Sequence, residues 1–490
     1  MRPSLAPLAA GLAMTTLLSC SLGTYKYTPC TSNIECRDAF GFGSVCGVDG
    51  LCAQAPTNNR CTETYPADLM TRPGNYANTI IFGSLYDHST DIPETLATAL
   101  PIIQVNDYGG LDGHDFAMVE CDYEANLAID DQTNDEAAAS GALYLADTIG
   151  VPAIIGPATS SQATTAYNAL HTGGLDDDVV MISPSATSVS LTTIDGVNPT
   201  DDNPGLFWRT APPDDLQGKV LGQLVTQAGF ANVVCIHESG PYGQGLYEAF
   251  DANYSGTSTE LSYSDQSAMI SDVTSNTRGY DAVLFFSSET TDIAAFLNAA
   301  TTLTYFGTMP IFFGDAARDT DLLNSAQGAS ALFPNITGTA PSIEYGDVYD
   351  AFDAAYSAQY APSAASDSVY TPYCFDATWL GLFGSAWSWY QDAPLHGLGI
   401  ARGLRHISDP AVSSANQTVL RPTNWAELVA SAQAGVDVNI VGASGNLDYD
   451  PATGETSGPV DVWTITATGD GFTTTETCDA VTGTCKPASN

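Results

Sequence analysis

The sequence predicts an α/β protein whose main body consists of two Rossmann-like, doubly wound lobes. From Asn78 onward, short apolar runs that resemble strands alternate with helix-like stretches of about 10 to 20 residues. Strands separated by helices in this rhythm form parallel sheets. The alternation extends over about 400 residues, which is too long for one such sheet, so two lobes are expected.

The individual elements follow from this alternation. The expected strands are Thr79–Gly83, Asp115–Val119, Ala153–Gly156, Val179–Ser183, Val233–His237, Ala282–Phe286 and Pro310–Phe313. The segments between them follow a helical pattern, namely Glu94–Asn106, Asp135–Thr148, Ser161–His171, Asp215–Ala228, Gly243–Ala252 and Thr291–Thr301. Further along, Phe375–Tyr390 and Asn424–Ala434 are expected helices, and Val462–Ala467 with Phe472–Glu476 an expected hairpin.

The N-terminus is typical of an exported lipoprotein. A single charged residue precedes Cys20, and an apolar run extends from Leu5 to Leu18. This run is too short to span a bilayer and has the features of a secretory signal segment. Its end, Leu17–Cys20, resembles a bacterial lipobox, in which the cysteine is acylated and becomes the first residue of the mature chain. We expect lipidation at Cys20, with an ordinary signal peptide as the alternative, and Ser21 favours the outer membrane.

The cysteines predict a small disulfide-rich module after the anchor. Removing Cys20 from 11 cysteines leaves 11 − 1 = 10, an even number in an oxidising compartment. Half of these lie in a segment poor in aliphatic residues, which cannot build a core and needs disulfides: Cys30, Cys36, Cys46, Cys52 and Cys61. Zinc is the alternative, although no CxxC or HxxxH spacing is present.

The remaining cysteines lie in the main body and the tail. Because five is an odd number, one cysteine of the module should pair outward, and we expect Cys61 to pair with Cys121. Cys478 and Cys485 should close a small loop near the C-terminus. Cys235 and Cys374 are left over, and Cys235 lies in an apolar run typical of a buried thiol.

The charge balance excludes several classes of partner. The chain has 13 Lys+Arg against 56 Asp+Glu, a net charge of −43. Nucleic acid needs clustered cations and is therefore excluded as a partner, and an anionic membrane surface is disfavoured. The 44% hydrophobic content is enough for a large core, so the bulk of the chain is not disordered.

A search for catalytic and metal-binding motifs finds none that fits. GxSxG, P-loop and GxGxxG patterns are missing, and the six histidines lack metal-ligand spacing. Residues 446–457 imitate the first half of an EF-hand loop, but Pro451 and Ser457 occupy the positions that need Gly and Glu. We expect no enzyme, no cofactor and no metal, with a looser calcium site and a secreted hydrolase as the alternatives.

Two hydroxyl-rich strand ends are the most informative segments. Ile154–Ser161 runs from a buried strand into a helix, whose free backbone N–H groups suit a ligand carboxylate. Met181–Thr187 is a second strand end with hydroxyls and free carbonyls. Each could be an ordinary capped turn, but together they indicate a site, because open α/β sheets bind ligands beyond the C-terminal ends of their strands.

These segments resemble the type I periplasmic binding proteins, in particular the branched-chain amino-acid-binding branch with the receptor ligand-binding region. The resemblance spans about Asn78 to Glu476. It is carried by the order and spacing of Asn106–Gly113, Ile155–Ser160, Ile182–Thr187, Phe207–Thr210 with Gln217-Gly218, Tyr242-Gly243, Asp376-Ala377 and Gly445–Asp450. It implies two lobes, joined by a three-segment hinge near Arg209, Asp315 and Gly445, that close on a small ligand.

The resemblance also implies the ligand-binding residues. On the first lobe, Ser160 and Thr187 match residues that hold the ligand carboxylate and ammonium, with the carbonyl of Ser185 nearby. On the second lobe, Tyr242 matches an aromatic residue that covers the ligand. Asp292 matches an acid that pairs with the ammonium.

Four further positions complete this expectation. Glu289 is a rival to Asp292, and the alternative for Asp292 is an acid that interacts with a helix dipole. Tyr86 and Asp87 should line the cleft. Asp315 should either contact the ligand or hold the hinge.

The sequence thus predicts a lipid-anchored extracytoplasmic solute-binding protein for an amino acid or similar small polar ligand, with an ABC permease as candidate partner. The alternative is an outer-surface sensory or interaction protein without transport, favoured by the Cys-rich module and by long acidic loops. The expected organisation is a signal peptide (1–19), Cys-rich module (20–65), first lobe (78–209 and 315–447), second lobe (210–314 and 448–477) and disulfide-closed tail (478–490).

Overall fold

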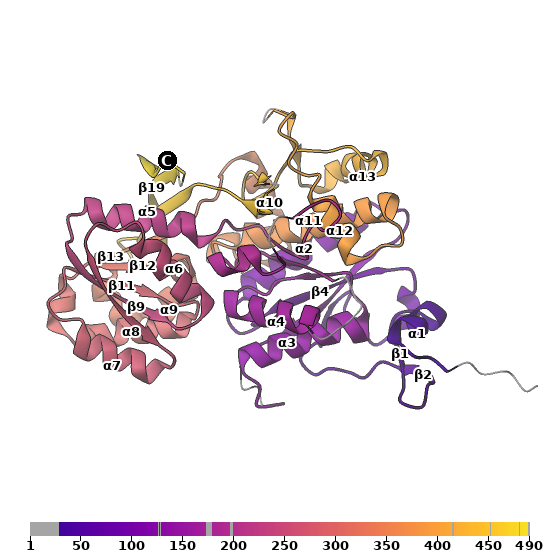
Figure 1. Ribbon diagram of the computed structural model, residues 1–490, viewed down its shortest axis with the longest axis horizontal. Coiled ribbons are helices and arrows are strands. Elements are labelled where there is room, and N and C mark those ends of the chain that lie inside the picture. Colours follow the sequence, from indigo (N-terminus) through magenta and orange to yellow (C-terminus); the bar gives the residue numbers. More distant parts are fainter. Residues whose placement is uncertain are drawn as a thin grey trace, which may run out of the picture.

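The computed structural model describes residues 29–125, 127, 129–172, 179–196, 199–413, 416–450, 452–479 and 481–488. The expected signal peptide and Cys20 lie outside these residues. Two lobes lie side by side, and each is built from segments that are distant in the sequence (Figure 1). Within the described residues, no helix combines the length and apolarity needed to cross a bilayer.

The first lobe is built on a six-stranded sheet in the order β3-β5-β4-β6-β7-β8. Its strands are β3 (Glu63–Tyr65), β4 (Ile80–Tyr86), β5 (Phe116–Asp122), β6 (Ala153–Ile155), β7 (Val180–Ser183) and β8 (Phe207–Arg209). All neighbours are parallel except β3, which pairs antiparallel with β5 at the edge. Both faces of the sheet are covered, which explains why these strands appear in the sequence as continuous apolar runs.

Helices cover the two faces of this sheet. One face packs against α3 (Asn134–Leu143) and α4 (Ser160–Thr172), and the other against α2 (Ile92–Asp107) and the long helix α11 (Thr371–Gln391). Further helices of this lobe are α10 (Asp347–Tyr360), α12 (Gly397–Leu404) and α13 (Trp425–Ala434). The middle of α11 is buried on all sides, including Trp379 at 0% exposure, which explains its aromatic and apolar composition.

The second lobe is built on an eight-stranded sheet in the order β10-β9-β11-β12-β13-β18-β19-β20. The parallel part contains β9 (Asn232–Glu238), β10 (Thr257–Tyr263), β11 (Ala282–Phe286), β12 (Ile311–Phe313) and β13 (Ile336–Pro341). The helices are α5 (Asp214–Gln227), α6 (Pro241–Asp251), α7 (Gln266–Asn276), α8 (Thr290–Thr301) and α9 (Thr320–Ser325). Apolar residues of α5 and α6 pack on one face of this sheet, and those of α7 and α8 on the other.

The terminal segment completes the second sheet. Strand β18 (Val460–Ile465) pairs antiparallel with β13, followed by β19 (Phe472–Asp479) and β20 (Thr484–Pro487). The expected hairpin is therefore present, and the expected separate tail is an extension of the second sheet. Smaller strand pairs are β14 (Thr418–Val419) with β15 (Ile440–Val441), and β16 (Tyr449–Asp450) with β17 (Glu455–Thr456).

The second hinge crossing lies at 342–346, not at Asp315 as expected from the sequence. Residues 315–341 remain in the second lobe, because β13 pairs with β12 on one side and β18 on the other. The sequence of β13, Ile-Thr-Gly-Thr-Ala-Pro, has few large apolar residues and ends in proline, so it does not resemble a core strand. Gly338 makes this strand possible, because the indole of Trp463 packs where a Cβ would stand.

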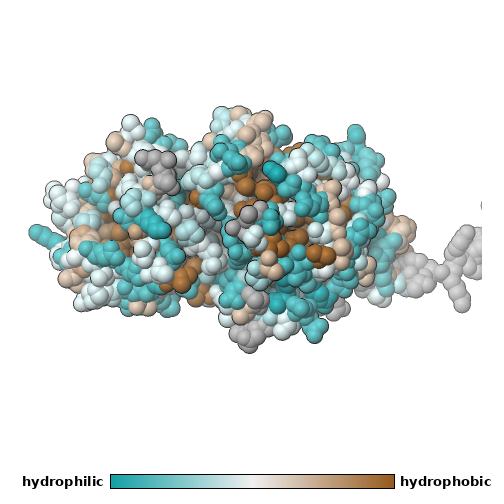
Figure 2. All heavy atoms as spheres, turned by 90° about the horizontal axis from the view of Figure 1, so that it is seen from above, coloured by the Kyte–Doolittle hydropathy of each residue, from teal (hydrophilic) through white to brown (hydrophobic). Residues whose placement is uncertain are grey.

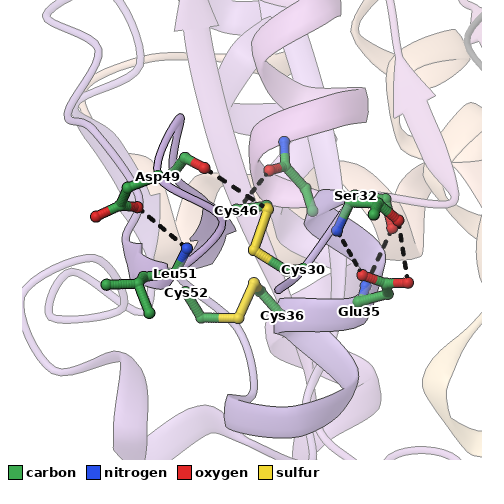
Figure 3. The surroundings of a disulfide bond; sticks show 11 residues. Cys30, Ser32, Glu35, Cys36, Cys46, Asp49, Leu51 and Cys52 are labelled. Carbon is green, nitrogen blue, oxygen red and sulfur yellow. Dashed lines mark hydrogen bonds between the residues drawn. A yellow bond between two sulfur atoms is a disulfide. The ribbon is translucent and has the colours of Figure 1, made fainter. Parts of the chain in front are cut away.

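A small module precedes the first lobe (Figure 3). Helix α1 (Asn33–Phe40) is joined to the hairpin of β1 (Ser44–Cys46) and β2 (Cys52–Gln54) by the disulfides Cys30–Cys46 and Cys36–Cys52. The side chain of Ser32 caps α1 by accepting from the N–H of Glu35 at 3.4 Å. Outside the disulfides, few apolar residues are buried here, as expected for a segment held by covalent links.

The expected outward disulfide attaches this region to the first lobe. Cys61 pairs with Cys121 in β5, and Cys478 pairs with Cys485 between β19 and β20, so both predicted pairs are confirmed. Cys235 and Cys374 are buried free thiols. The surface seen from above is mostly hydrophilic or neutral, with apolar residues gathered in a few areas, the largest near the middle (Figure 2).

Candidate functional site

The topology of both lobes places their strand ends around one cleft. The parallel strands of each sheet follow one order, in which the second strand lies beside the first, and the third, fourth and fifth follow on the other side of the first. The connections therefore run over opposite faces of the sheet on the two sides of the first strand. Sheets of this order bind ligands at the crevice beside that strand, beyond its carboxyl end. In the first lobe the crevice lies between β4 and β6, and in the second between β9 and β11.

A cavity of about 80 Å³ occupies this position between the lobes. Its first-lobe wall comes from the segments after β4, β5, β6 and β7, and its second-lobe wall from the segments after β9, β11 and β12. The polar lining residues include Asp87, Asp91, Glu94, Tyr123, Asn134, Thr159, Ser160, Ser185, Tyr242, Ser288, Glu289, Asp315, Arg318, Asp319, Ser368 and Tyr370.

Hydroxyl groups and a helix N-terminus form one part of the first-lobe wall. Ser160 is the first residue of α4, and its Oγ accepts from the N–H of Ser188 at 3.1 Å. The hydroxyl of Ser185 donates to the carbonyl of Ala158 at 2.8 Å. These bonds hold the two predicted loops against each other, and the N-terminus of α4 lies at the cavity with the favourable dipole for an anionic group.

The lobes touch beside this wall. The hydroxyl of Ser188 donates to the carbonyl of Pro241, the first residue of α6, at 2.8 Å. Arg209 also holds the loop that carries Ser188, because its Nη1 donates to the carbonyls of Ala186 and Ser188 at 3.0 and 2.8 Å. The cavity is therefore enclosed on this side by direct contact between the two lobes.

Asp315 ties the second lobe to the first. It is 2% exposed, and its Oδ1 accepts from Gln217 Nε2 at 2.8 Å and from the hydroxyl of Tyr242 at 2.7 Å. Its Oδ2 accepts from the hydroxyl of Tyr370, which precedes α11 of the first lobe. With three donors on its two oxygens, Asp315 holds the two lobes together. The hydroxyl of Tyr242 is committed to the same network.

Acidic side chains line the rest of the cavity. Burial raises the pKa of Asp91 to about 7 and that of Asp319 to about 7, and nearby acids add to both shifts. Burial, followed by the charges of Glu238 and Asp91, raises the pKa of Glu289 to about 8. Glu94 is shifted in the same direction by burial and by its neighbours Asp91 and Asp319, so its pKa lies well above the usual range.

The residues predicted from the sequence fall into two sets. Ser160, Ser185, Tyr242 and Asp315 line the cavity, as does Asp87. Thr187, Tyr86 and Asp292 are not among its lining residues.

Physical reasons account for these three positions. Thr187 is 1% exposed beneath the cavity wall. Tyr86 points into the core, where its hydroxyl bonds the Oγ1 of Thr98 at 2.8 Å. Asp292 lies in the first turn of α8 and accepts from Gln266 Nε2 at 3.1 Å, while Glu289, the rival named above, is the N-cap residue that lines the cavity.

Sequence reasoning missed Asp91, Glu94 and Asp319. Asp91 is the N-cap of α2 and Glu94 lies in its first turn, after strand β4, and Asp319 is the N-cap of α9. An acid at the start of a helix is ordinarily explained by the helix dipole, so each was unremarkable by itself. The signal was their position after β4 and β12, whose carboxyl ends both face the cleft.

A second acidic group lies at the margin of the cavity. Carboxylate oxygens of Asp87, Asp122 and Glu124 lie within 4.8 Å of one another. Two of these carboxylates already have partners, because Asp122 Oδ1 accepts from the N–H groups of His88 and Glu124 at 3.1 and 2.8 Å, and Asp87 Oδ1 accepts from the hydroxyl of Ser89 at 2.6 Å. Arg60 lies beside them, donating from Nη1 to the carbonyls of Asp122 and Glu124 at 3.2 and 2.8 Å, so a cation is already supplied by the chain.

Solved structures with the same fold are solute-binding proteins. LivJ, a branched-chain amino acid transporter substrate-binding protein from Streptococcus pneumoniae in complex with isoleucine, is 19% identical with a TM-score of 0.59, covering 81% of this chain and 99% of that one. LivK, a leucine-binding protein from Thermotoga maritima, is 17% identical with a TM-score of 0.59, covering 84% and 98%. A solute-binding protein of an ABC transporter from Rhodopseudomonas palustris, in complex with p-hydroxybenzoic acid, is 14% identical with a TM-score of 0.59, covering 82% and 97%.

Sequence comparison identifies the family. Glutamate receptor 2.7 of Arabidopsis thaliana is 33% identical over 135 residues, which cover 27% of this chain and 13% of that receptor. The sequence model described as the receptor family ligand binding region matches residues 97–468, which include most of both lobes. The chain therefore belongs to the receptor family ligand binding region family, with the type I periplasmic binding protein fold.

Proposed function

We propose that this protein is a lipid-anchored, extracytoplasmic solute-binding protein that closes its two lobes on an amino acid or a similar small polar ligand. The observation that carries the proposal is the cavity between the lobes, with the N-terminus of α4 on its first-lobe wall and carboxyl groups from both lobes around the rest. Such an arrangement complements a ligand with an anionic and a cationic end. Binding to both walls favours the closed arrangement of the lobes.

The size of the cavity supports a small ligand. A buried water needs a cavity volume of about 10 to 15 Å³, so this cavity of about 80 Å³ has room for roughly six waters. This suits a molecule of amino acid size and excludes a folded peptide segment. The proposal includes no catalysis, in line with the solute-binding proteins of the same fold whose structures are complexes with isoleucine and p-hydroxybenzoic acid.

Calorimetry with the purified chain tests the proposal. Amino acids, small amides and aromatic acids are titrated, and binding with one site per chain is expected for at least one class. Glu289→Gln should weaken that binding, because Glu289 lines the cavity. Glu427→Gln, which alters an exposed acid of α13 away from the cavity, is the control and should leave affinity unchanged. If no small polar ligand binds, the proposal is wrong.

Membrane attachment is proposed through the acyl chains on Cys20. A chain with 56 acidic against 13 basic residues is repelled by anionic lipid, so the lipid anchor would be the sole attachment. In a bacterial expression host, Cys20→Ser should move the protein from the membrane to the soluble fraction. Persistence of the variant in the membrane fraction would contradict this part of the proposal.

The alternative is a surface sensory or interaction protein with the same ligand cleft and no permease. The disulfide-held module favours it, because this module packs on the first lobe, with Asn33 Nδ2 donating to the carbonyl of Asp147 at 3.2 Å. Uptake of labelled ligand by cells distinguishes the two functions. Transport lost on deletion of the gene supports permease delivery, and unchanged uptake supports the sensory function.

A further inference from the structure

The cavity is lined by more negative than positive charge. Six carboxyl groups line it, three from the first lobe and three from the second: Asp87, Asp91, Glu94, Glu289, Asp315 and Asp319. Arg318 is the one cationic side chain among the described lining residues. Its Nη1 donates to Asp461 Oδ2 at 3.4 Å and its Nη2 to Thr474 Oγ1 at 3.2 Å. Arg318 is therefore paired with a buried acid of the second sheet and does not neutralise the acids of the cleft.

Glu94 independently indicates a missing partner. It is 6% exposed and lines the cavity, yet its Oε2 makes no hydrogen bond to any described residue. A buried polar atom without a partner costs free energy, and a site that retains one is suited to a donor from outside the chain. Asp315 provides the contrast, because three donors occupy its oxygens.

The acids that line the cavity form two groups, and each group has members from both lobes. Asp91, Glu94 and Asp319 line the same cavity, and besides burial the charges of Asp91 and Asp319 raise the pKa of Glu94. Burial and the charge of Glu238 raise the pKa of Glu289, and the charges of Asp91 and Asp87 raise it further. Glu289, Asp91 and Asp87 form the second group. Asp91 is common to both groups. No cation is among the main causes of either shift, so like charges on the two lobes disfavour the ionised acids at both places.

We propose that the ligand of this cleft carries two separate cationic nitrogens, one held between Glu94 and Asp319 and the other between Asp87 and Glu289, as in a diamine or a basic amino acid. This inference rests on the proposed function, because it names the ligand class of the same cleft. Each cation bridges an acid of the first lobe and one of the second, so it replaces repulsion by attraction across the cleft and favours closure.

The remaining lining residues suit the carbon chain between the nitrogens. Tyr123, Tyr242, Val369 and Tyr370 line the same cavity and supply apolar surface. The hydroxyls of Tyr123 and Tyr242 are already used, by Asp91 at 3.0 Å and by Asp315 at 2.7 Å. Their rings can therefore pack against methylene groups or the face of a cation without losing a hydrogen bond.

Calorimetry with the full purified chain tests the inference. The probes are 1,4-diaminobutane, lysine, leucine and calcium chloride, each at the same ionic strength. We expect 1,4-diaminobutane or lysine to bind at least tenfold more tightly than leucine. Tighter binding of lysine than of the diamine identifies a ligand with a carboxylate, and the reverse order identifies a diamine. Glu94→Gln and Glu289→Gln should each weaken dication binding at least tenfold, and Glu427→Gln, which alters an exposed acid of α13, should not.

The outcomes separate this inference from the proposed function. Leucine binding as tightly as the dications leaves the proposed function intact and overturns the inference. Binding of calcium alone, or displacement of a diamine by calcium at equal concentration, also overturns it. If no probe and no other small polar ligand binds, both fail. Melting of each ligand-free variant checks its folding, and if Glu94→Gln does not fold, Glu289→Gln decides.

Discussion

Arg209 is predicted to be the most costly single ion-pair residue to remove at the hinge. It is 1% exposed, at the end of β8, and its Nε and Nη2 bond the carboxylate of Glu455 at 2.6 and 2.7 Å. It also donates to the carbonyls of Ala186 and Ser188 and, at 2.9 Å, to the hydroxyl of Thr192. Arg209→Met removes five hydrogen bonds and leaves Glu455, only 11% exposed, without its cation.

The magnitude follows from this burial. Breaking a buried, hydrogen-bonded ion pair by removing one partner costs about 3 to 5 kcal/mol. The matched control is Arg72→Met, because Arg72 is 71% exposed and lies 3.7 Å from Asp68. An exposed pair of this kind contributes less than about 1 kcal/mol. The double variant Arg209→Met with Glu455→Met should recover part of the loss, because no unpaired buried charge remains.

Urea denaturation followed by tryptophan fluorescence and circular dichroism measures these differences. A free energy of unfolding lowered by about 3 to 5 kcal/mol for Arg209→Met is expected. The same variant should also weaken ligand binding, because Arg209 holds the loop that carries Ser185. The reasoning is refuted if Arg209→Met lowers the free energy of unfolding no more than Arg72→Met does. It is also refuted if the double variant is less stable than Arg209→Met by as much as breaking a second ion pair would cost.

Three further predictions concern the folded state. Glu289 and Asp91 have pKa values raised to about 8 and about 7, so between about pH 4 and 8 the folded chain holds protons that the unfolded chain releases. The melting temperature of the ligand-free protein should therefore fall as the pH rises from 5 to 8, and Glu289→Gln should flatten that slope; a rise over this range would contradict the assignment. Replacing Cys61 and Cys121 by serine opens a disulfide with a sequence separation of 60, and the same change at Cys478 and Cys485 opens one with a separation of 7. Chain entropy predicts that these variants lose about 4 and about 2 kcal/mol of unfolding free energy, as measured by denaturation. Gly338→Ala should destabilise by about 1 to 3 kcal/mol, because a Cβ there overlaps the indole of Trp463, whereas Gly307→Ala, with no atom within 4 Å of its Cβ, should be neutral in thermal melts. Equal effects of these two glycine variants would argue against β13 in the second sheet.

The sequence alone determined the fold class and the order of most elements. Strands such as β4, β9 and β11 are buried on both faces by helices, so each is a continuous apolar run that can be recognised locally. The disulfide Cys478–Cys485 followed from local information, because the two cysteines are close in the tail, and the odd number of cysteines in the module indicated an outward bridge such as Cys61–Cys121. The hydroxyl-rich strand ends with Ser160 and Ser185 were recognisable because ligands of such sheets bind at that edge.

Tertiary structure alone decided the second hinge crossing and most of the acidic wall. Strand β13 is held by its neighbours β12 and β18 rather than by its own apolar content, so its place in the second lobe has no local signal. Likewise, Glu289 rather than Asp292 lines the cavity, because the N-cap residue of α8 faces the cleft while the carboxylate of Asp292 accepts a hydrogen bond from Gln266. Asp91, Glu94 and Asp319 form part of one site only because the fold brings together the carboxyl ends of β4 and β12, which are distant in the sequence. The charges that attract or repel each of these acids therefore belong to residues that are near only in the folded chain.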